Sequence, residues 1–170
     1  MSELAITVIG HDRTGIVADV SEILARLGAN LTDSTMTRLR GHFAMTLVCT
    51  GPDVAEVEAA LRPLCADGQL LATVREVRPD AEAAVGGEPY VLSVHGADRL
   101  GIVAAVTRVV AAAGGNVTDL TTRLSGSLYV LVAEVELPAD ATEPVAGALA
   151  VVADELGVDV TLRPVDTDVL

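Results

Sequence analysis

Aromatic side chains are scarce in this 170-residue sequence, which has no Trp, one Phe and two Tyr. Because 51% of the residues are nevertheless hydrophobic, the core must consist of Val, Leu, Ile and Ala, and the composition excludes a disordered chain. Proteins that bind single-stranded nucleic acid stack the bases on aromatic rings. The shortage of rings therefore argues against that class of function.

Basic residues are also few, with 11 Lys and Arg against 24 Asp and Glu, which gives a formal net charge of −13. A surface this acidic repels phosphate backbones and anionic lipids, so we expect no direct contact with nucleic acid or membrane. The charge also suffices to keep a small and very apolar protein soluble, and this simpler interpretation of it is favoured.

The two cysteines, Cys49 and Cys65, lack C-x-x-C spacing and lie in apolar stretches, which predicts reduced thiols. The N-terminus has no signal-peptide features, and no apolar run reaches the length of a membrane span without a charge or a glycine. We therefore expect a soluble, cytoplasmic protein. Its three histidines are not at metal-ligand spacing, and no Ser–His–Asp arrangement emerges, so we expect no metal site, no cofactor and no catalytic residue.

One pattern is present twice. The segment LAITVIGHDRTGIVADVSEILARLGANLTD (4–33) returns as YVLSVHGADRLGIVAAVTRVVAAAGGNVTD (90–119), with a constant offset of 86 residues. After these segments, a one-residue gap aligns Arg38 and Gly41 with Arg123 and Gly126. We predict one domain in residues 1–78, a linker in residues 79–88 and a second domain in residues 89–170.

Hydrophobic periodicity gives each copy the order βαββαβ. Alternating apolar residues predict strands, and apolar residues at helical spacing follow from Ile16 and Ile102. Hairpin turns are predicted at Arg40–Gly41 and Ser125–Gly126, and Thr142 is predicted to cap the last helix. Right-handed crossovers place such strands in one antiparallel sheet with both helices on one face. The predicted fold class is α+β, with two ferredoxin-like units.

The loop after the first strand is the most informative segment. It reads Gly10-His-Asp-Arg-Thr-Gly15-Ile-Val in copy one and Gly96-Ala-Asp-Arg-Leu-Gly101-Ile-Val in copy two. A helix that begins there presents unpaired N–H groups and positive partial charge to an anion. Neither a dinucleotide fingerprint nor a P-loop is present. From these residues alone, the simpler alternative is favoured: the aspartates cap the helix, or Asp-Arg forms a local ion pair in a surface turn.

The βαββαβ order, with (D/N)-R-x-G-(I/V/L) at the first strand–helix junction and G-x-N at the start of the second strand, resembles the ACT domain family. The second element is Gly28-Ala-Asn30 in copy one and Gly114-Gly-Asn116 in copy two. The resemblance covers nearly the whole chain. The tandem arrangement without an attached enzyme is similar to the glycine cleavage system transcriptional repressor group.

The resemblance implies a regulatory protein that binds an amino acid or a similar metabolite at interfaces between ACT units. The ligand-binding residues that it implies are Asp12, Gly15, Ile16, Asn30, Leu31, Asp98, Gly101, Ile102, Asn116 and Val117. Serine-binding members of the family have Asn at the positions of Asp12 and Asp98. An aspartate there attracts the ammonium group of an amino acid and repels its carboxylate.

The leading hypothesis is a non-catalytic regulatory protein that forms a homodimer and acts on a partner protein. If it controls transcription, we expect it to do so through that partner and not through DNA. The alternative is a purely structural interaction module without a ligand. An enzyme is the least favoured hypothesis, because the two repeats leave no residues for a catalytic domain.

Overall fold

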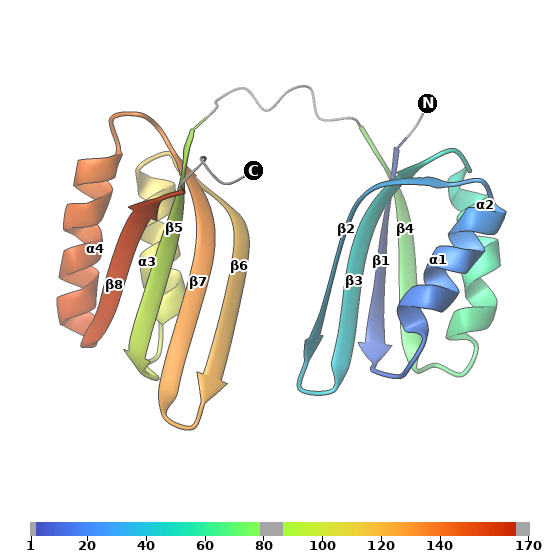
Figure 1. Cartoon of the computed structure of the whole chain (residues 1–170), viewed down its shortest axis with the longest axis horizontal. Helices are drawn as coiled ribbons and strands as arrows, with labels where there is room; N and C mark the ends of the chain where they lie inside the picture. The colour runs from blue at the N-terminus through green and yellow to red at the C-terminus, as the bar shows by residue number, and fades with distance from the viewer. Residues whose placement is uncertain (1–2, 79–86, 166–170) are drawn as a thin grey trace. The chain divides into compact units, whose positions relative to one another are not determined.

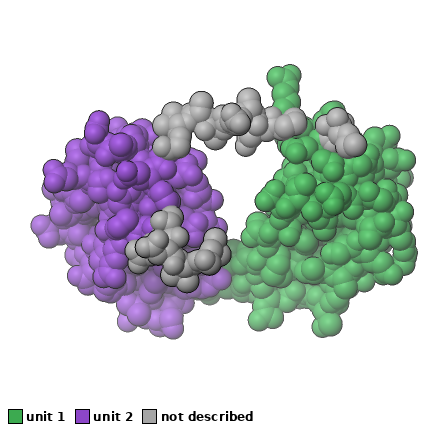
Figure 2. Space-filling view, turned by 45° about the horizontal axis from the view of Figure 1, so that its top comes forward, with its two compact units in different colours: residues 1–82 green, residues 83–170 purple. Residues whose placement is uncertain are grey.

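The computed structural model describes residues 3–78 and 87–165, which belong to two compact units, coloured green and purple in Figure 2. Residues 79–86 of the predicted linker lie outside the described residues. Glu88, its last residue, already belongs to a strand. Among the described residues, no helix combines the length and the apolar character needed to cross a membrane.

Unit 1 is one antiparallel sheet with the strand order β2-β3-β1-β4. Both helices lie on one face of this sheet (Figure 1). Its elements are β1 (Glu3–His11), α1 (Ile16–Arg26), β2 (Asn30–Leu39), β3 (His42–Thr50), α2 (Val54–Leu61), the 3₁₀ helix η1 (Arg62–Cys65) and β4 (Leu70–Val77).

Unit 2 repeats this topology with the strand order β6-β7-β5-β8. Its elements are β5 (Glu88–Ala97), α3 (Ile102–Ala112), β6 (Asn116–Ser125), β7 (Leu128–Leu137), α4 (Thr142–Leu156) and β8 (Val158–Pro164). The predicted ferredoxin-like βαββαβ order is confirmed for both units.

The core of each unit lies between the sheet and its helices and is almost entirely aliphatic. In β1 the side chains of Leu4, Ile6 and Val8 are buried, while the intervening residues point to the opposite face, as strand periodicity requires. Among the described residues no polar or charged side chain is buried. Side chains from the helix-facing side of the sheet and from the helices together form each core.

The one-residue gap predicted between the copies is wrong. The residues opposite His42 and Leu128 in the first strand of each unit are His11 and Ala97, so the 86-residue offset persists through the third strands. The copies place their turn glycines differently: the loops are Arg40–Gly41 and Gly126–Ser127, not Ser125–Gly126. Arg40 and Gly41 have φ of 49° and 84°, as in a type I′ turn. Aligning glycine with glycine created the gap.

The second helix of each unit begins in a different way. In unit 1 Asp53 is the N-cap of α2, and it forms a capping box with Glu56. In unit 2 the predicted N-cap, Thr142, is instead the first helical residue, and the N-cap is Ala141 without a side-chain bond. The Thr142 hydroxyl instead forms a 2.9 Å hydrogen bond with the hydroxyl of Tyr90 on β5. Helix α4 is thus tied to the sheet by a side chain that the sequence pattern assigned to capping.

Two glycines of unit 2 give a matched test of backbone conformation. Gly101 has φ of +86°, a left-handed conformation, whereas Gly147 lies inside α4, and a Cβ added to either glycine would meet no atom within 4 Å. We expect Gly101→Ala to lower the free energy of unfolding by about 1–2 kcal/mol, because L-residues are strained there. Gly147→Ala should raise it by roughly 0.5–1 kcal/mol. Urea denaturation of the full chain measures both, and a neutral or stabilising Gly101→Ala would contradict the first expectation.

Candidate functional site

Backbone contacts hold the loop between β1 and α1 in place. A Cβ added at Gly10 would lie 2.0 Å from the carbonyl oxygen of Gln69, so only glycine allows β1 to pass the start of β4 so closely. The next two amides donate to carbonyl oxygens on both sides of the strand, His11 to Gln69 and Asp12 to Gly41, each at 2.9 Å. The loop therefore leaves the sheet in a fixed direction, toward the first turn of α1.

Helices α1 and α3 both begin at a glycine in the left-handed conformation. Gly15 and Gly101 are the N-caps, with φ of 91° and 86°, and neither helix has a side-chain capping bond. The alternative in which Asp12 and Asp98 cap these helices is therefore wrong. The first amides of a helix have no carbonyl partner within it, so the backbone here suits an anion. The side chains of Ile16 and Ile102 are in the core, which leaves only their backbone N–H groups for a ligand.

The two loop aspartates differ in their surroundings. The Asp12 carboxylate forms a 3.3 Å ion pair with Arg38 on β2, and its side chain is 26% exposed. At the unbroken 86-residue offset, Leu124 takes the place of Arg38 in unit 2. Asp98 is exposed, and within residues 3–78 and 87–165 its carboxylate has no hydrogen bond or ion pair. The loop of unit 1 is thus compensated in charge and that of unit 2 is not.

The ion pair predicted within the surface turn, between Asp12 and the neighbouring Arg13, does not form. Arg13 pairs with another aspartate instead. Arg13 binds Asp19 of the first helical turn at 2.9 Å. Both side chains are nearly half exposed, so the pair contributes little to stability. Its effect is local, since it holds the Arg13 guanidinium at the first turn of α1.

The predicted Gly-x-Asn residues lie at the other end of each unit. Asn30 pairs with Thr50, which is opposite Glu3 at the beginning of β1, whereas Asp12 follows the end of that strand. Helix α1 runs between them, and eleven helical residues span roughly 16 Å. Asp98 and Asn116 are separated by α3 in the same way. One unit therefore does not bring its loop and its asparagine to the same small ligand.

The start of β2 and of β6 carries a β-bulge that exposes these residues. The register shifts between Leu31 and Asp33, and again between Val117 and Asp119. The threonine inside each bulge donates its hydroxyl hydrogen to a carbonyl oxygen of the neighbouring strand at 3.3 Å. Asn30, Leu31 and Asn116 are exposed and Val117 is half-buried, so this end of each unit is open to a partner or a ligand.

A groove of about 810 Å³ in unit 2 follows α3 from its N-cap to the start of β6. It contains three of the five predicted residues of this unit, Gly101, Asn116 and Val117, but not Asp98 or Ile102. Small residues form much of its wall, and Arg108 is its one charged lining residue. Sequence reasoning missed Arg108, although a single charge in a helix of Ala and Val could have signalled it. The equivalent residue of unit 1, Glu22, is paired with Arg26 at 2.8 Å.

Apolar side chains are exposed along the edge strand of each unit. They lie on the helix-facing side of β2 and β6, and we call each set an edge ledge. The ledge of unit 1 is Leu31 and Met36, and the ledge of unit 2 is Leu120 and Leu124. Val17 and Val103 on the first helix of each unit are exposed as well. Among the described strands, β2 and β6 each pair on one side only. Their outer edges therefore present both unpaired backbone groups and exposed apolar side chains to a partner.

One core thiol and three histidines complete the reactive side chains of the described residues that sequence analysis singled out. Burial raises the pKa of the Cys49 thiol, which lies in the core on β3. No cluster of three His, Cys, Asp or Glu side chains that could hold a metal ion occurs among the described residues. The histidines are exposed: His11 and His42 lie with ring centroids 6.4 Å apart, and His95 lies 3.4 Å from Asp159.

Known proteins resemble this chain over both units. A family model of the ACT domain matches residues 2–75 and 88–163. A solved structure of an unknown protein from Galdieria sulphuraria is 32% identical, covers 96% of this chain and 98% of its own, and has a TM-score of 0.82. A solved structure named as a putative glycine cleavage system transcriptional repressor shares the fold at 19% identity, with a TM-score of 0.72 and coverage of 95% and 96%.

Shorter relatives match less than one repeat. A UPF0237 protein of Methanopyrus kandleri is 41% identical over 64 residues, which are 38% of this chain and 68% of the relative. Another, from Methanocaldococcus jannaschii, is 46% identical over 48 residues, so the match spans about half of that relative, 53%. Because the family model matches both repeats, the chain belongs to the ACT domain family, as a tandem pair of ACT units.

Proposed function

We propose that this chain is a non-catalytic regulatory protein that binds a small amino acid where two ACT units meet. The observation that carries the proposal is the separation of the two motifs by the length of a helix. The loop amides and Asp98 lie at one end of α3, and Asn116 lies at the other. An antiparallel pairing of two such units, edge strand against edge strand, places the loop of one beside the asparagine of the other.

The chemistry at such a shared corner suits a zwitterion. The unpaired amides at Gly101 and Ile102 are donors for a carboxylate, and the Asp98 carboxylate attracts an ammonium group. The side-chain amide of an asparagine from the facing unit supplies one more donor and one acceptor. In unit 1 the carboxylate of Asp12 is already compensated by Arg38, so the loop of unit 2 is the stronger of the two candidate sites.

A second copy of the chain is the proposed source of the facing unit. The edge ledges and the unpaired sides of β2 and β6 offer apolar area and backbone hydrogen bonds to the same partner. The proposed assembly is a homodimer that changes its affinity for a regulated protein when the amino acid binds. The proposed location is the cytoplasm, which agrees with two free cysteines in the described residues.

One observation favours the alternative, a purely structural module without a ligand. The Asp12–Arg38 pair ties the first loop to the edge strand of unit 1 and consumes the charge that would bind an ammonium group. In this alternative both loops only shape the interface between units. The alternative therefore predicts that the edge of the sheet matters for assembly and that the loop charges do not matter for any ligand.

Titration calorimetry of the full chain with a panel of single amino acids tests the ligand. We expect heat and a rise in the thermal midpoint with at least one of them, because ligand that binds only the folded state stabilises it. The panel includes glycine, serine, aspartate and leucine, with the matching amines and carboxylates as controls. Silence with every amino acid, by heat and by thermal shift, would remove the ligand from the proposal.

The loop aspartates provide a matched pair of variants. Asp98→Asn should weaken binding of the amino acid identified by calorimetry roughly tenfold, since a charge-assisted hydrogen bond is lost. Asp12→Asn should weaken it less, because Arg38 already compensates that charge. Calorimetry of both variants, with circular dichroism as the folding control, gives the comparison. Equal affinities in both variants and the unmodified chain would contradict a role for these carboxylates.

A substitution on an edge strand tests whether the dimer interface lies there. Leu120→Lys, on the ledge of unit 2, should shift the full chain from dimer to monomer in light scattering coupled to gel filtration, because the lysine would be buried at the interface. Val151→Lys is the control, since Val151 is 56% exposed on α4 and away from β6. If Leu120→Lys dissociates the dimer while calorimetry stays silent, the structural module is the better description. A dimer that survives Leu120→Lys would place the interface elsewhere.

A further inference from the structure

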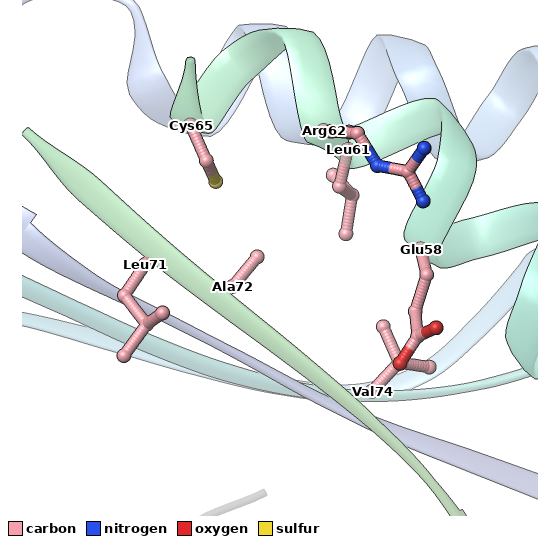
Figure 3. Close-up of a pocket in the computed structure, with 7 residues that line it drawn as sticks. All are labelled: Glu58, Leu61, Arg62, Cys65, Leu71, Ala72 and Val74. Atoms are coloured by element: carbon pink, nitrogen blue, oxygen red, sulfur yellow. The ribbon is translucent and has the colours of Figure 1, made fainter. Parts of the chain in front are cut away.

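A separate hollow lies in unit 1 between α2, η1 and β4, the strand at the opposite edge of the sheet from β2 (Figure 3). Its volume is about 270 Å³. The helical side contributes Glu58, Leu61, Arg62 and Cys65, and the strand contributes Leu71, Ala72 and Val74. None of these residues belongs to the loop, the groove or the edge ledges described above.

The second unit of the same chain shows why the hollow exists. Gly10 pairs with Leu70, and Gly96 pairs with Val158, so the last strands align at an offset of 88 residues. Ala72 of the hollow thus corresponds to Val160, and Val74 corresponds to Leu162. In unit 2 these larger side chains pack against the core. Helix α4 runs for 15 residues, whereas α2 ends at Leu61, where Pro63 follows in η1. Smaller side chains and a broken helix together leave the space.

The polar residues around the hollow are also specific to unit 1. The buried pairs Val57 with Val145 and Leu61 with Leu149 set the same 88-residue offset for the helices. At that offset, the three residues Glu58, Arg62 and Cys65 correspond to Ala146, Ala150 and Ala153. One copy therefore has a carboxylate, a guanidinium and a thiol where its duplicate has three small side chains.

Glu58 and Arg62 do not pair with each other. They are four residues apart on one helical face, the same spacing as Glu22 and Arg26, which form an ion pair at 2.8 Å. In residues 3–78 and 87–165, neither Glu58 nor Arg62 makes a side-chain ion pair or hydrogen bond. Figure 3 shows both charged groups toward one end of the hollow and the Cys65 thiol toward the other, with Leu61 and Ala72 between them.

We propose that this hollow is a second ligand site, which binds the zwitterion of a small aliphatic α-amino acid. Arg62 binds its carboxylate, Glu58 binds its ammonium group, and the aliphatic side chain lies on Leu61, Ala72 and Val74. The volume is below the ~300–1,000 Å³ of pockets for larger ligands, which limits the occupant to a few heavy atoms. The site is independent of the unit–unit corner, so either can exist without the other.

Cys65 gives a direct readout of occupancy. Its thiol is half-buried at the wall of the hollow, whereas Cys49 is fully buried in the core, so a small alkylating reagent should distinguish them. The experiment measures the rate of Cys65 alkylation by iodoacetamide in the full chain, by peptide mass spectrometry, with and without L-leucine. Saturating L-leucine should slow the reaction about fivefold, because a bound ligand covers the wall of its pocket. The controls 4-methylpentanoate and 3-methylbutylamine, which each lack one charged group, should protect far less.

Variants that copy unit 2 sharpen the test. Ala72→Val should abolish protection by filling the hollow, and Glu58→Ala or Arg62→Ala should raise the L-leucine concentration for half protection roughly tenfold. Glu22→Ala, which breaks the other helical pair, and Asp98→Asn, at the unit–unit corner, should leave protection unchanged. Each variant is compared with itself with and without leucine, so altered thiol access does not affect the ratio.

Two results would overturn the proposal. One is an unchanged alkylation rate at the highest soluble concentration of L-leucine, and the other is equal protection in Ala72→Val. If Glu58 and Arg62 served only the stability of α2, their variants would lower the thermal midpoint and leave the protection ratio as it was. Weaker calorimetric binding at the unit–unit corner in Asp98→Asn, together with unchanged Cys65 protection by L-leucine, would show that the two sites are separate.

Discussion

Each unit depends on one constraint: two helices cover one face of a four-stranded sheet, and among the described residues no element covers the far edge strand. The side chains on the helix-facing side form an aliphatic core without buried polar groups among the described residues. The outer strand of each sheet, β2 or β6, extends beyond the cover of the helices, so its leucines and Met36 stay exposed. A packed core and an unsatisfied edge are thus two results of the same small architecture.

The sequence predicted regular structure well because apolar periodicity is a direct record of which side faces the core. The apolar residues at helical spacing from Ile16 and from Ile102 are helices α1 and α3, which begin at those two residues. The prediction from sequence failed at the second hairpin turn, where a glycine was its only evidence. Gly41 and Gly126 occupy different positions of the same two-residue turn, and only strand pairing reveals this. Thr142 shows a similar failure, since a hydroxyl that suits an N-cap equally suits a bond to Tyr90.

The candidate site was predicted in part. The role of the loop and of the Gly-x-Asn segment in binding a ligand stays a prediction, and the capping role that pattern alone gave Asp12 and Asp98 is filled by a left-handed glycine instead. The Asp12–Arg38 pair could not be foreseen, because the mistaken gap matched Arg38 with Arg123, which lies on the other face of its strand. In each unit the loop lies at one end of the first helix, α1 or α3, and the Gly-x-Asn segment lies at the other. The helix therefore fixes the distance between the two parts of the motif, which the sequence pattern does not show.

The unbroken offset from β1 through β3, and from β5 through β7, has a consequence for how the copies diverged. The two copies differ in length only after these strands. The first three strands and first helix of one copy could therefore replace those of the other without a change in strand register. The last helix and strand are free of that requirement, and there the copies acquired different lengths, fillings and charges. The duplication thus preserved the hydrogen-bonded pairing of the first three strands, while the last helix and strand of each copy were free to change.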